Sequence, residues 1–454
     1  MGATEKLARF IVEFPGEQIP ESIFHQGKRC FMNFLAVALY ASRDPSVDIL
    51  LDLMREEGGK RLASVVGRSF RTTLQNASLA NGYLGHHQDY DDTHFSTIIH
   101  PSSPIFPGAL AVAEHLGVSG RDFLVASVLG IEAACRIGCV IAPAFREAAS
   151  FWHITGTCGV FGSAAAAGRL LRLNRDRMVH GLGIAGTQAC GLREVFGSMC
   201  KPFHAGHAAQ RGVLAALLAQ RGFTSTDAIL EGKRGFVAVM AAGYDLDKAM
   251  ADLGERWELP QVGLKPYACG LANHALVDAM FALRSKEGVT PENVESISGS
   301  VRALAPALAT RRHPTTGLEG KFSYHHSMAS VLVDGAAFPD QYTDEKVMDP
   351  RIVSLRDRIS VTADPSLQGH AAAVTMVLKD GRSYKETIDH PTGSPERPMG
   401  DAQVEAKFRN LAREALSKNR VERLVGQLWA LDKIADMRSV TTLVRSGRAE
   451  TSQP

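Results

Sequence analysis

The chain has 454 residues, of which 45% are hydrophobic and 22% charged, and its formal net charge at pH 7 is only +2. A chain of this length and composition can bury a large core and is expected to form two domains, while the balanced charge argues against a nucleic-acid or membrane partner. The seven cysteines form no CxxC pair, which predicts reduced thiols in a cytoplasmic protein without an iron–sulfur cluster. We expect no targeting leader and no apolar run of the ~18 residues that a membrane span requires.

Helices are predicted for most of the first 265 residues. Pro20 is placed to open a helix whose residues 31–40 are apolar almost all round, and Gly117 is placed to end a helix over 106–116. A further helix over 122–140 is apolar on nearly every face. Because no run with period-two alternation occurs before about residue 265, this part is predicted to contain no strands.

A dense polar cluster follows the Ala- and Asn-rich segment 72–84, and it contains His86, His87, Asp89, Asp91, Asp92, His94 and His100. A carboxylate beside an imidazole shifts the pKa of both groups toward the working range, so the cluster predicts an acid–base site. The same residues could instead cap a helix or lie on a solvated face. A metal site is a third and less favoured interpretation, because neither HExxH nor EF-hand spacing is present.

Two later stretches also carry candidate chemistry. His153 precedes a helix start rich in Thr and Gly, whose backbone N–H groups can bind an anion, although a lone histidine near apolar residues is more often structural. Pro202 is expected to break any preceding helix, so that Lys201 lies at a turn and His204 and His207 begin the next helix. A lysine with two histidines there predicts a carboxylate-binding corner, and a solvated basic turn is the alternative.

The pattern changes after residue 265. Strands are predicted over 294–301, 358–362, 373–378 and 384–388, with Asp380-Gly381 as a hairpin turn and helices over 274–284 and 324–332. From Asp401 the spacing is helical again. We therefore predict a mainly α fold, in which a large helical domain (1–265 and 399–454) carries an inserted, smaller α+β lid domain (266–398).

Several motifs together resemble the MmgE/PrpD family, and they occur in the family's order over nearly the full length. They are the segments 81–94 and 100–102, 153–157, 186–188, 201–206, and 265–269 with His274. The family includes 2-methylcitrate dehydratase, cis-aconitate decarboxylase and iminodisuccinate epimerase. The resemblance implies a helical domain built from both chain ends, an α+β lid, a homodimer, and no iron–sulfur cluster.

The resemblance implies a set of site residues, to which the pattern around Lys201 adds His204. Those expected to be catalytic are Asp89, His100, His153, Lys201 and His274, and those expected to bind substrate are Thr93, His204, Lys321 and Tyr324. Lys201 with His204 would hold carboxylates, His100 or His153 would exchange a carbon-bound proton, and Asp89 would orient an imidazole or help a hydroxyl leave. Thr93 would supply a hydrogen bond.

The favoured hypothesis is a lyase without metal or cofactor that dehydrates a small di- or tricarboxylate of the methylcitrate or citrate type. An epimerase of an iminodisuccinate-like dicarboxylate, a cis-aconitate-type decarboxylase and a non-catalytic carboxylate-binding protein are the alternatives. The expected partners are the small carboxylate and a second copy of the chain in a homodimer, with no nucleic acid and no membrane. The expected location is the cytoplasm.

Overall fold

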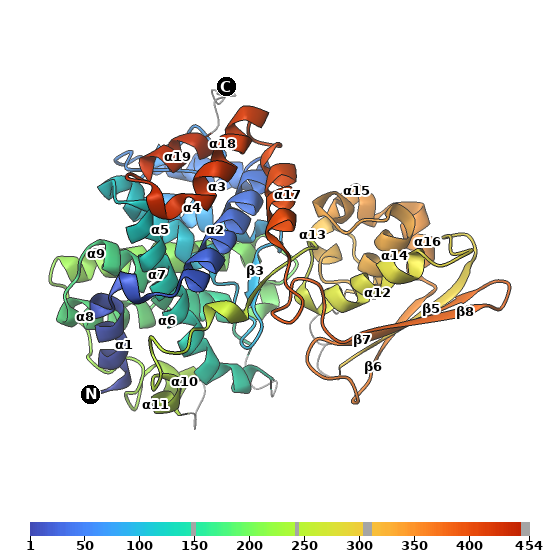
Figure 1. Cartoon of the computed structure of the whole chain (residues 1–454), viewed down its shortest axis with the longest axis horizontal. Helices are drawn as coiled ribbons and strands as arrows, with labels where there is room; N and C mark the ends of the chain where they lie inside the picture. Colours follow the sequence, from blue (N-terminus) through green and yellow to red (C-terminus); the bar gives the residue numbers. More distant parts are fainter. Residues whose placement is uncertain (147–150, 241–244, 303–310, 446–454) are drawn as a thin grey trace.

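The computed structural model describes residues 1–146, 151–240, 245–302 and 311–445. Two bodies are visible in Figure 1: a larger helical one that contains both the first and the last described helices, and a smaller one that contains a sheet. The mainly α fold predicted from the sequence is confirmed. The domain boundaries at 265/266 and 398/399 stay a prediction.

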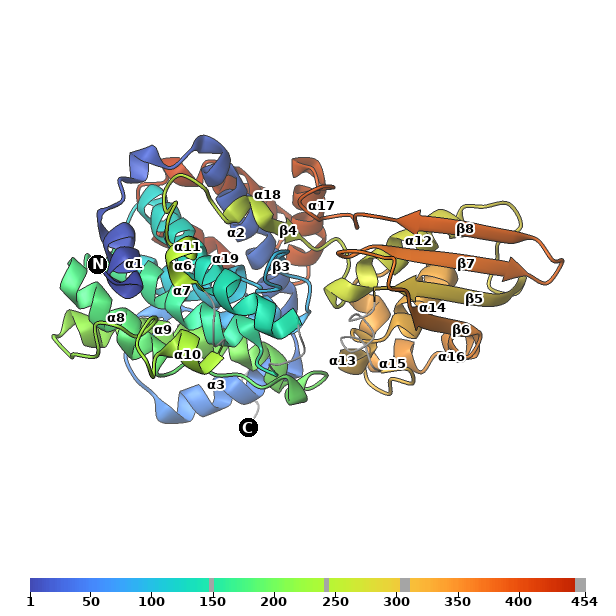
Figure 2. The ribbon, with the colours of Figure 1, turned by 90° about the horizontal axis from the view of Figure 1, so that it is seen from below.

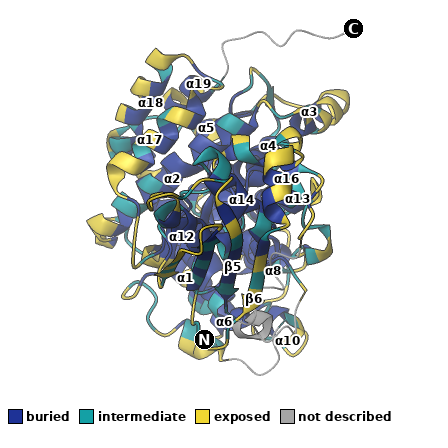
Figure 3. Cartoon of the chain, turned by 90° about the vertical axis from the view of Figure 1, so that its right-hand side faces the viewer, coloured by how far each residue is buried: buried dark blue, intermediate teal, exposed yellow. Residues whose placement is uncertain are grey.

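The larger body consists of helices packed around one another. In chain order they are α1 (Ala3–Glu13), α2 (Glu21–Ala41), α3 (Pro45–Glu57), α4 (Leu74–His87), α5 (Ser102–Leu116), α6 (Gly120–Arg146), α7 (Ile154–Leu170), α8 (Arg175–Gly186), α9 (Cys200–Gln220), α10 (Phe236–Met240) and α11 (Leu246–Ala249). In Figure 3 the inner helices α2 and α5 are largely buried, whereas α3 on the outside is largely exposed. The apolar residues 31–40 of α2 lie in this core, as their pattern predicted.

Short strands occur where none was predicted. β1 (Ala63–Ser64) pairs antiparallel with β2 (Arg71–Thr72), and β3 (Asp92–His94) pairs antiparallel with β4 (Val262–Leu264). Ladders of two or three residues are too short to show a period-two pattern, so the sequence could not reveal them. The β3–β4 pair matters for the site because it brings residues 92–94 beside residues 262–264.

The chain returns to the larger body after residue 400 through α17 (Asp401–Ala412), α18 (Lys418–Trp429) and α19 (Arg438–Val444). Figure 1 shows these helices beside α2, although nearly 360 residues of sequence separate α2 from α17. The predicted helical pattern after Asp401 is therefore confirmed.

The smaller body contains a four-stranded sheet in the order β6-β5-β7-β8. Its strands are β5 (Val294–Val301), β6 (Ile359–Ala363), β7 (Ala372–Leu378) and β8 (Ser383–Ile388), with β6 parallel to β5 and the other pairs antiparallel. Alternate residues of β7 are buried, because α12 (His274–Arg284) and α14 (Tyr324–Asp334) pack on one face of the sheet, as Figure 2 shows. The shorter helices α13 (Gly317–Gly320), α15 (Asp344–Val347) and α16 (Pro350–Arg356) complete this body. The predicted strands and the Asp380-Gly381 hairpin are confirmed, with Gly381 at a φ of +85°.

Two sequence expectations are corrected by the structure. Part of α6, Gly120–Ala142, is long and apolar enough to cross a membrane, so the expectation of no such run was wrong. Of the 18-residue stretch of this helix that meets the criterion, 94% is buried in the protein interior. Lys201 does not lie at a turn before a helix, because α9 begins at Cys200 and includes Lys201 and Pro202 in its first turn. Proline is tolerated there because the first N–H groups of a helix have no intrahelical acceptor.

Candidate active site

The site forms where α4 and α9 cross. A Cβ on Gly82 of α4 would lie 2.6 Å from the Cα of Gly206, and a Cβ on Gly206 of α9 would lie 2.3 Å from the carbonyl oxygen of Leu79. Only glycine at both positions permits this close approach. The crossing brings His86, in the last turn of α4, within reach of Lys201, in the first turn of α9.

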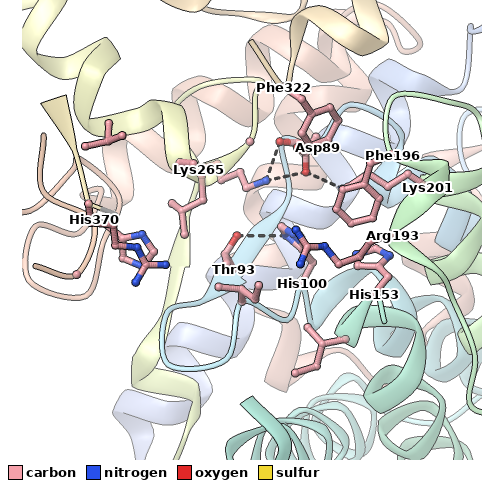
Figure 4. A pocket seen from close by; sticks show the side chains of 18 of the residues that line it. Asp89, Thr93, His100, His153, Arg193, Phe196, Lys201, Lys265, Phe322 and His370 are labelled. Atoms are coloured by element: carbon pink, nitrogen blue, oxygen red, sulfur yellow. Dashed lines mark hydrogen bonds and ion pairs between the residues drawn. The ribbon is translucent and has the colours of Figure 1, made fainter. Parts of the chain in front are cut away.

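Asp89 is the centre of the site and is 3% exposed. It follows α4 and has a φ of +50°, a left-handed conformation that is uncommon for a residue other than glycine and is found at functional sites. Its Oδ1 accepts hydrogen bonds from Lys201 Nζ at 3.0 Å and from Lys265 Nζ at 2.9 Å, as Figure 4 shows. Burial opposes ionisation of Asp89, but the two ammonium groups, Lys201 first, hold its pKa well below its ordinary value.

Each of the two ammonium groups keeps a donor for a ligand. Lys201 Nζ contacts His86 Nε2 at 2.8 Å as well as Asp89, and Lys265 Nζ donates to both Oδ1 and the backbone oxygen of Asp89. An ammonium has three N–H donors, so one on each lysine has no acceptor among the residues that the structure describes. Burial lowers the pKa of Lys201 against the opposing effect of Asp89, which makes its ammonium a better acid than a surface lysine.

A chain of hydrogen bonds runs from Lys201 into the protein. His86 Nδ1 lies 2.7 Å from Asp91 Oδ2, and the Ser103 hydroxyl donates to the same oxygen at 2.6 Å. The carboxylate of Asp91 therefore accepts the Nδ1 proton, which leaves the Nε2 of His86 to accept from Lys201. Burial lowers the pKa of His86, so its ring is neutral.

His100 is the imidazole whose tautomer the structure defines best. Its Nδ1 lies 2.7 Å from the backbone oxygen of Asp92 and 3.2 Å from the hydroxyl of Thr93. A carbonyl only accepts, so Nδ1 carries the proton and Nε2 has a free lone pair. Burial and then Lys265 hold the pKa of His100 well below its ordinary value, so this ring is a neutral base.

His153 precedes the first turn of α7 and is paired with a second histidine. Its Nδ1 lies 3.0 Å from Nδ1 of His204, and its ring meets the ring of Phe196 edge to face at 5.0 Å. Burial, and then Lys201, hold the pKa of His153 well below its ordinary value; burial lowers that of His204 to about 4. Two neutral rings can share one proton in the hydrogen bond between them, one as donor and one as acceptor.

These groups line one cavity. Its lining includes Asp89, Thr93, His100, His153 and Lys201 from the predicted set, together with the cationic residues Lys265, Arg193 and Arg302 and the apolar residues Ile98, Trp152, Ile154, Phe196, Leu271 and Phe322. A second cavity of about 790 Å³ adjoins it and shares Arg193, Arg302 and His370. Among the described lining residues of the first cavity, Asp89 is the only carboxylate, so its walls carry an excess of positive charge.

Four predicted residues lie outside this lining. His204 contacts His153 but does not line the cavity. Lys321 Nζ donates to the backbone oxygen of Gln88 at 3.0 Å and to its Oε1 at 2.7 Å, so Lys321 holds the residue before Asp89 in place. His274 Nε2 lies 3.2 Å from the backbone oxygen of Cys269, and Tyr324 is buried at the start of α14. The roles assigned to these residues stay predictions.

The sequence did not single out Lys265, Arg193 or Phe196. Lys265 begins one of the family motifs, and Arg193 ends the segment 186–193, whose first three residues form another; this was the only signal available. Both reach the cavity through pairing that involves distant segments. Lys265 follows β4, which pairs with β3, and the backbone N–H of Arg193 donates to the oxygen of Phe151 at 2.8 Å.

The imidazoles lie close enough together to raise the question of a metal. Nitrogen atoms of His86, His100 and His153 lie within 4.8 Å of one another. However, the Lys201 ammonium is 2.8 Å from His86 Nε2, and it would repel a cation placed there. The absence of a metal and of a cofactor stays a prediction.

Comparison with known sequences identifies the family. The MmgE/PrpD N-terminal domain matches residues 5–249, and the MmgE/PrpD C-terminal domain matches residues 267–431. The chain belongs to the MmgE/PrpD family. The resemblance found in the sequence motifs is thereby confirmed.

Relatives of this chain include proteins named cis-aconitate decarboxylase and proteins named 2-methylcitrate dehydratase. A cis-aconitate decarboxylase of Aspergillus terreus is 25% identical over 98% of this chain and 96% of its own length, and that of Mus musculus is 27% identical over 97% and 93%. A 2-methylcitrate dehydratase of Cupriavidus necator is 25% identical over 77% of this chain and 78% of its own length. As predicted, the chain is an enzyme of the lyase class at the level of the family.

Proposed function

We propose that this MmgE/PrpD protein is a cofactor-independent hydro-lyase that removes water from a small hydroxy di- or tricarboxylate. The observation that supports this most is the composition of one cavity. Neutral imidazoles of His100 and His153 lie there beside fixed cations, with Asp89 as the only carboxylate in the described lining. Cations recognise carboxylates, and neutral imidazoles can accept a proton from carbon.

The substrate carboxylate next to the reacting carbon would bind the free N–H donor of Lys265. This donor is preorganised, because the other two hold both Oδ1 and the backbone oxygen of Asp89 at 2.9 Å. A fixed cation there stabilises the negative charge that develops when a proton leaves the adjacent carbon. Thr93, whose hydroxyl lies 3.2 Å from His100 Nδ1, helps to hold the base in place.

Dehydration requires a base and an acid, and the site contains both. The Nε2 lone pair of His100 takes the proton from carbon, and the electrons of the broken C–H bond form the C=C bond. The C–O bond then breaks as the hydroxyl takes a proton from the Lys201 ammonium and leaves as water. Asp89 and His86 each accept one N–H of Lys201, which directs its third N–H toward the substrate.

Decarboxylation of an unsaturated tricarboxylate is a second candidate, and two observations favour it. The rings of Phe196 and Phe322 lie 5.4 and 5.5 Å from Lys201 Nζ and form an apolar wall beside the acid. Such a wall would disfavour a charged carboxylate and favour departing carbon dioxide. The relatives named cis-aconitate decarboxylase also align with nearly the whole chain, whereas the dehydratase of Cupriavidus necator aligns with 77% of it.

Proton NMR in deuterated water separates these reactions. The purified protein is incubated with 2-methylcitrate, citrate, cis-aconitate or iminodisuccinate, and the spectra are followed with time. Loss of water from a hydroxy acid supports the hydro-lyase, loss of carbon dioxide from cis-aconitate supports the decarboxylase, and deuterium uptake without net loss indicates an epimerase. No change with any of the four contradicts the proposed substrate class.

The same assay needs a matched pair of variants. Lys201→Met removes the acid, and Lys379→Met removes an exposed lysine of the β7–β8 hairpin at equal change of charge. Turnover should be lost in the first and kept in the second. Equal activity of both variants would contradict the role given to Lys201.

We also propose that the enzyme acts as a homodimer in the cytoplasm, without a nucleic-acid or membrane partner. Light scattering coupled to size-exclusion chromatography tests the dimer directly. A monomer at micromolar concentration that retains full turnover would contradict it.

A further inference from the structure

Arg193 is a cation in the cavity wall that the acid–base chemistry does not use. It begins a short 3-10 helix, Arg193–Val195, and its segment pairs antiparallel with the one that carries His153. Trp152 pairs with Leu192, His153 N donates to Gly191 O at 2.8 Å, and Arg193 N donates to Phe151 O at 2.8 Å. This ladder fixes the backbone of Arg193 relative to His153.

The Arg193 side chain carries a charge that no carboxylate among the described residues compensates. Its guanidinium lies 5.9 Å from the centre of the Phe196 ring, and among the described residues no carboxylate forms an ion pair with it. Burial lowers the pKa of Arg193, but a guanidinium in a protein remains protonated. A half-buried cation without a counter-ion is costly unless a ligand supplies the negative charge.

The two lysines of the same cavity, unlike Arg193, are paired with a carboxylate. Lys201 and Lys265 share the Asp89 carboxylate, at 3.0 and 2.9 Å, so this trio carries one net positive charge. Arg193 supplies a second and separate positive centre. It lines both the cavity that contains His100 and the adjoining one, and in Figure 4 its side chain extends toward the cavity beside Phe196 and His153.

We propose that Arg193 binds a second substrate carboxylate, remote from the carbon that loses its proton, and thereby restricts the enzyme to polycarboxylates. The inference rests on the proposed function, because Lys265 is taken to hold the carboxylate at the reacting carbon. The planar guanidinium can bind the remote carboxylate through two parallel hydrogen bonds. A monocarboxylate would leave Arg193 unpaired and is therefore rejected.

Isothermal titration calorimetry with tricarballylate tests this without turnover, because tricarballylate has three carboxylates and no hydroxyl to lose. The variants are Arg193→Gln, Arg193→Lys and, as a matched control, Arg211→Gln. Arg211 lies on α9, its Nε donates to His207 Nε2 at 3.2 Å, and it is not among the lining residues of either cavity. All variants are first checked for an unchanged thermal unfolding midpoint.

We expect Arg193→Gln to weaken tricarballylate binding about 10- to 100-fold, which corresponds to the loss of one charge-assisted contact. Arg193→Lys should recover only part of the affinity, and Arg211→Gln should bind like the unmodified protein. On a substrate found by NMR, Arg193→Gln should raise KM and change kcat by only a few fold.

Two results would overturn the inference, and they differ in what they say about the reaction. If Arg193→Gln binds tricarballylate as tightly as the unmodified protein while Lys265→Met does not, Arg193 is not a carboxylate ligand and the proposed lyase still stands. If the unmodified protein binds no tricarballylate and turns over none of the four test acids, the proposed function fails together with the inference.

Discussion

Two buried carboxylates in the larger body, Asp89 and Glu258, have similar partners and different surroundings. Asp89 lies between Lys201 and Lys265, with His86 beside Lys201. Glu258 forms an ion pair with Arg256, lies 3.1 Å from His94 Nε2, and has Arg136 Nε at 3.8 Å. Asp89 lines the cavity, whereas neither Glu258 nor Arg136 is among the described lining residues.

The cations explain the difference between these two clusters. Arg136 donates to Glu132 at 2.6 Å, to the backbone oxygen of Ala249 at 2.9 Å and to that of Asp252 at 3.2 Å, so its donors are used inside the protein. The lysines of the Asp89 cluster each keep a donor, and a lysine can release a proton where an arginine cannot. A buried ionic cluster therefore indicates chemistry when its cations can titrate and still have a free donor at a cavity, and indicates structure when they do not.

The largest effect should come from Lys201→Met. Because the variant lacks the proposed acid, we expect kcat/KM to fall by about 10³-fold or more. Asp89 keeps Lys265 as a partner, so the free energy of unfolding should change less than in a variant of the Glu258 cluster. Steady-state kinetics and chemical denaturation measure the two quantities, and a large loss of stability with normal kcat in the folded fraction would contradict the comparison.

Arg136→Met should show the opposite pattern. Removing a fully buried cation leaves Glu132, Asp252 and Glu258 with fewer partners, and breaking such a buried cluster costs about 3–5 kcal/mol of unfolding free energy. Urea denaturation should detect this loss, while kcat of the folded fraction should be unchanged. A selective loss of kcat would mean that the Glu258 cluster also contributes to catalysis.

Lys407→Met should affect both stability and activity, because Lys407 connects the C-terminal return to the site. Its Nζ donates to Asn33 Oδ1 at 2.7 Å and to the backbone oxygens of Tyr90 and Lys265, at 2.7 and 2.8 Å. Three buried acceptors would lose their donor, at a cost of about 3 kcal/mol. Tyr90 follows Asp89 in the chain and Lys265 donates to Asp89, so kcat should also fall. A variant with full kcat and an unchanged free energy of unfolding would show that the Lys407 contacts are dispensable.

His274→Asn tests a buried imidazole outside the cavity through the pH dependence of stability. Burial lowers the pKa of His274 to about 3, from an ordinary value of 6.5. The neutral ring therefore stabilises the fold above pH 6.5, and this contribution is lost as the pH falls toward 3, because the unfolded chain binds the proton first. Between pH 7 and pH 5, the free energy of unfolding of the unmodified protein should fall by about 2 kcal/mol more than that of the variant, as measured by urea denaturation. Parallel losses would mean that His274 is protonated in the folded protein.

The sequence determined much of the fold by local patterns. Gly117 follows a helix and Gly381 lies in a hairpin turn, and both adopt the left-handed conformation that these positions predict. The strands of the four-stranded sheet form at the alternating or apolar runs of the sequence. The motifs also identified Asp89, His100, His153 and Lys201, which the structure brings to one cavity. The helix start at Cys200 was missed because proline is compatible with both a break and a first turn.

Only the tertiary structure decided which charged residues share a site. Lys265 meets Asp89 across 176 positions, and Lys407 meets the Lys265 carbonyl across 142, which no local spacing can encode. Tertiary packing likewise placed His274 and Lys321 against backbone oxygens outside the cavity, and it left Arg193 in the cavity wall with no counter-ion among the residues that the structure describes. Residue types fix what chemistry is possible, whereas burial and the neighbours that the fold supplies fix the protonation states and the free donors on which that chemistry depends.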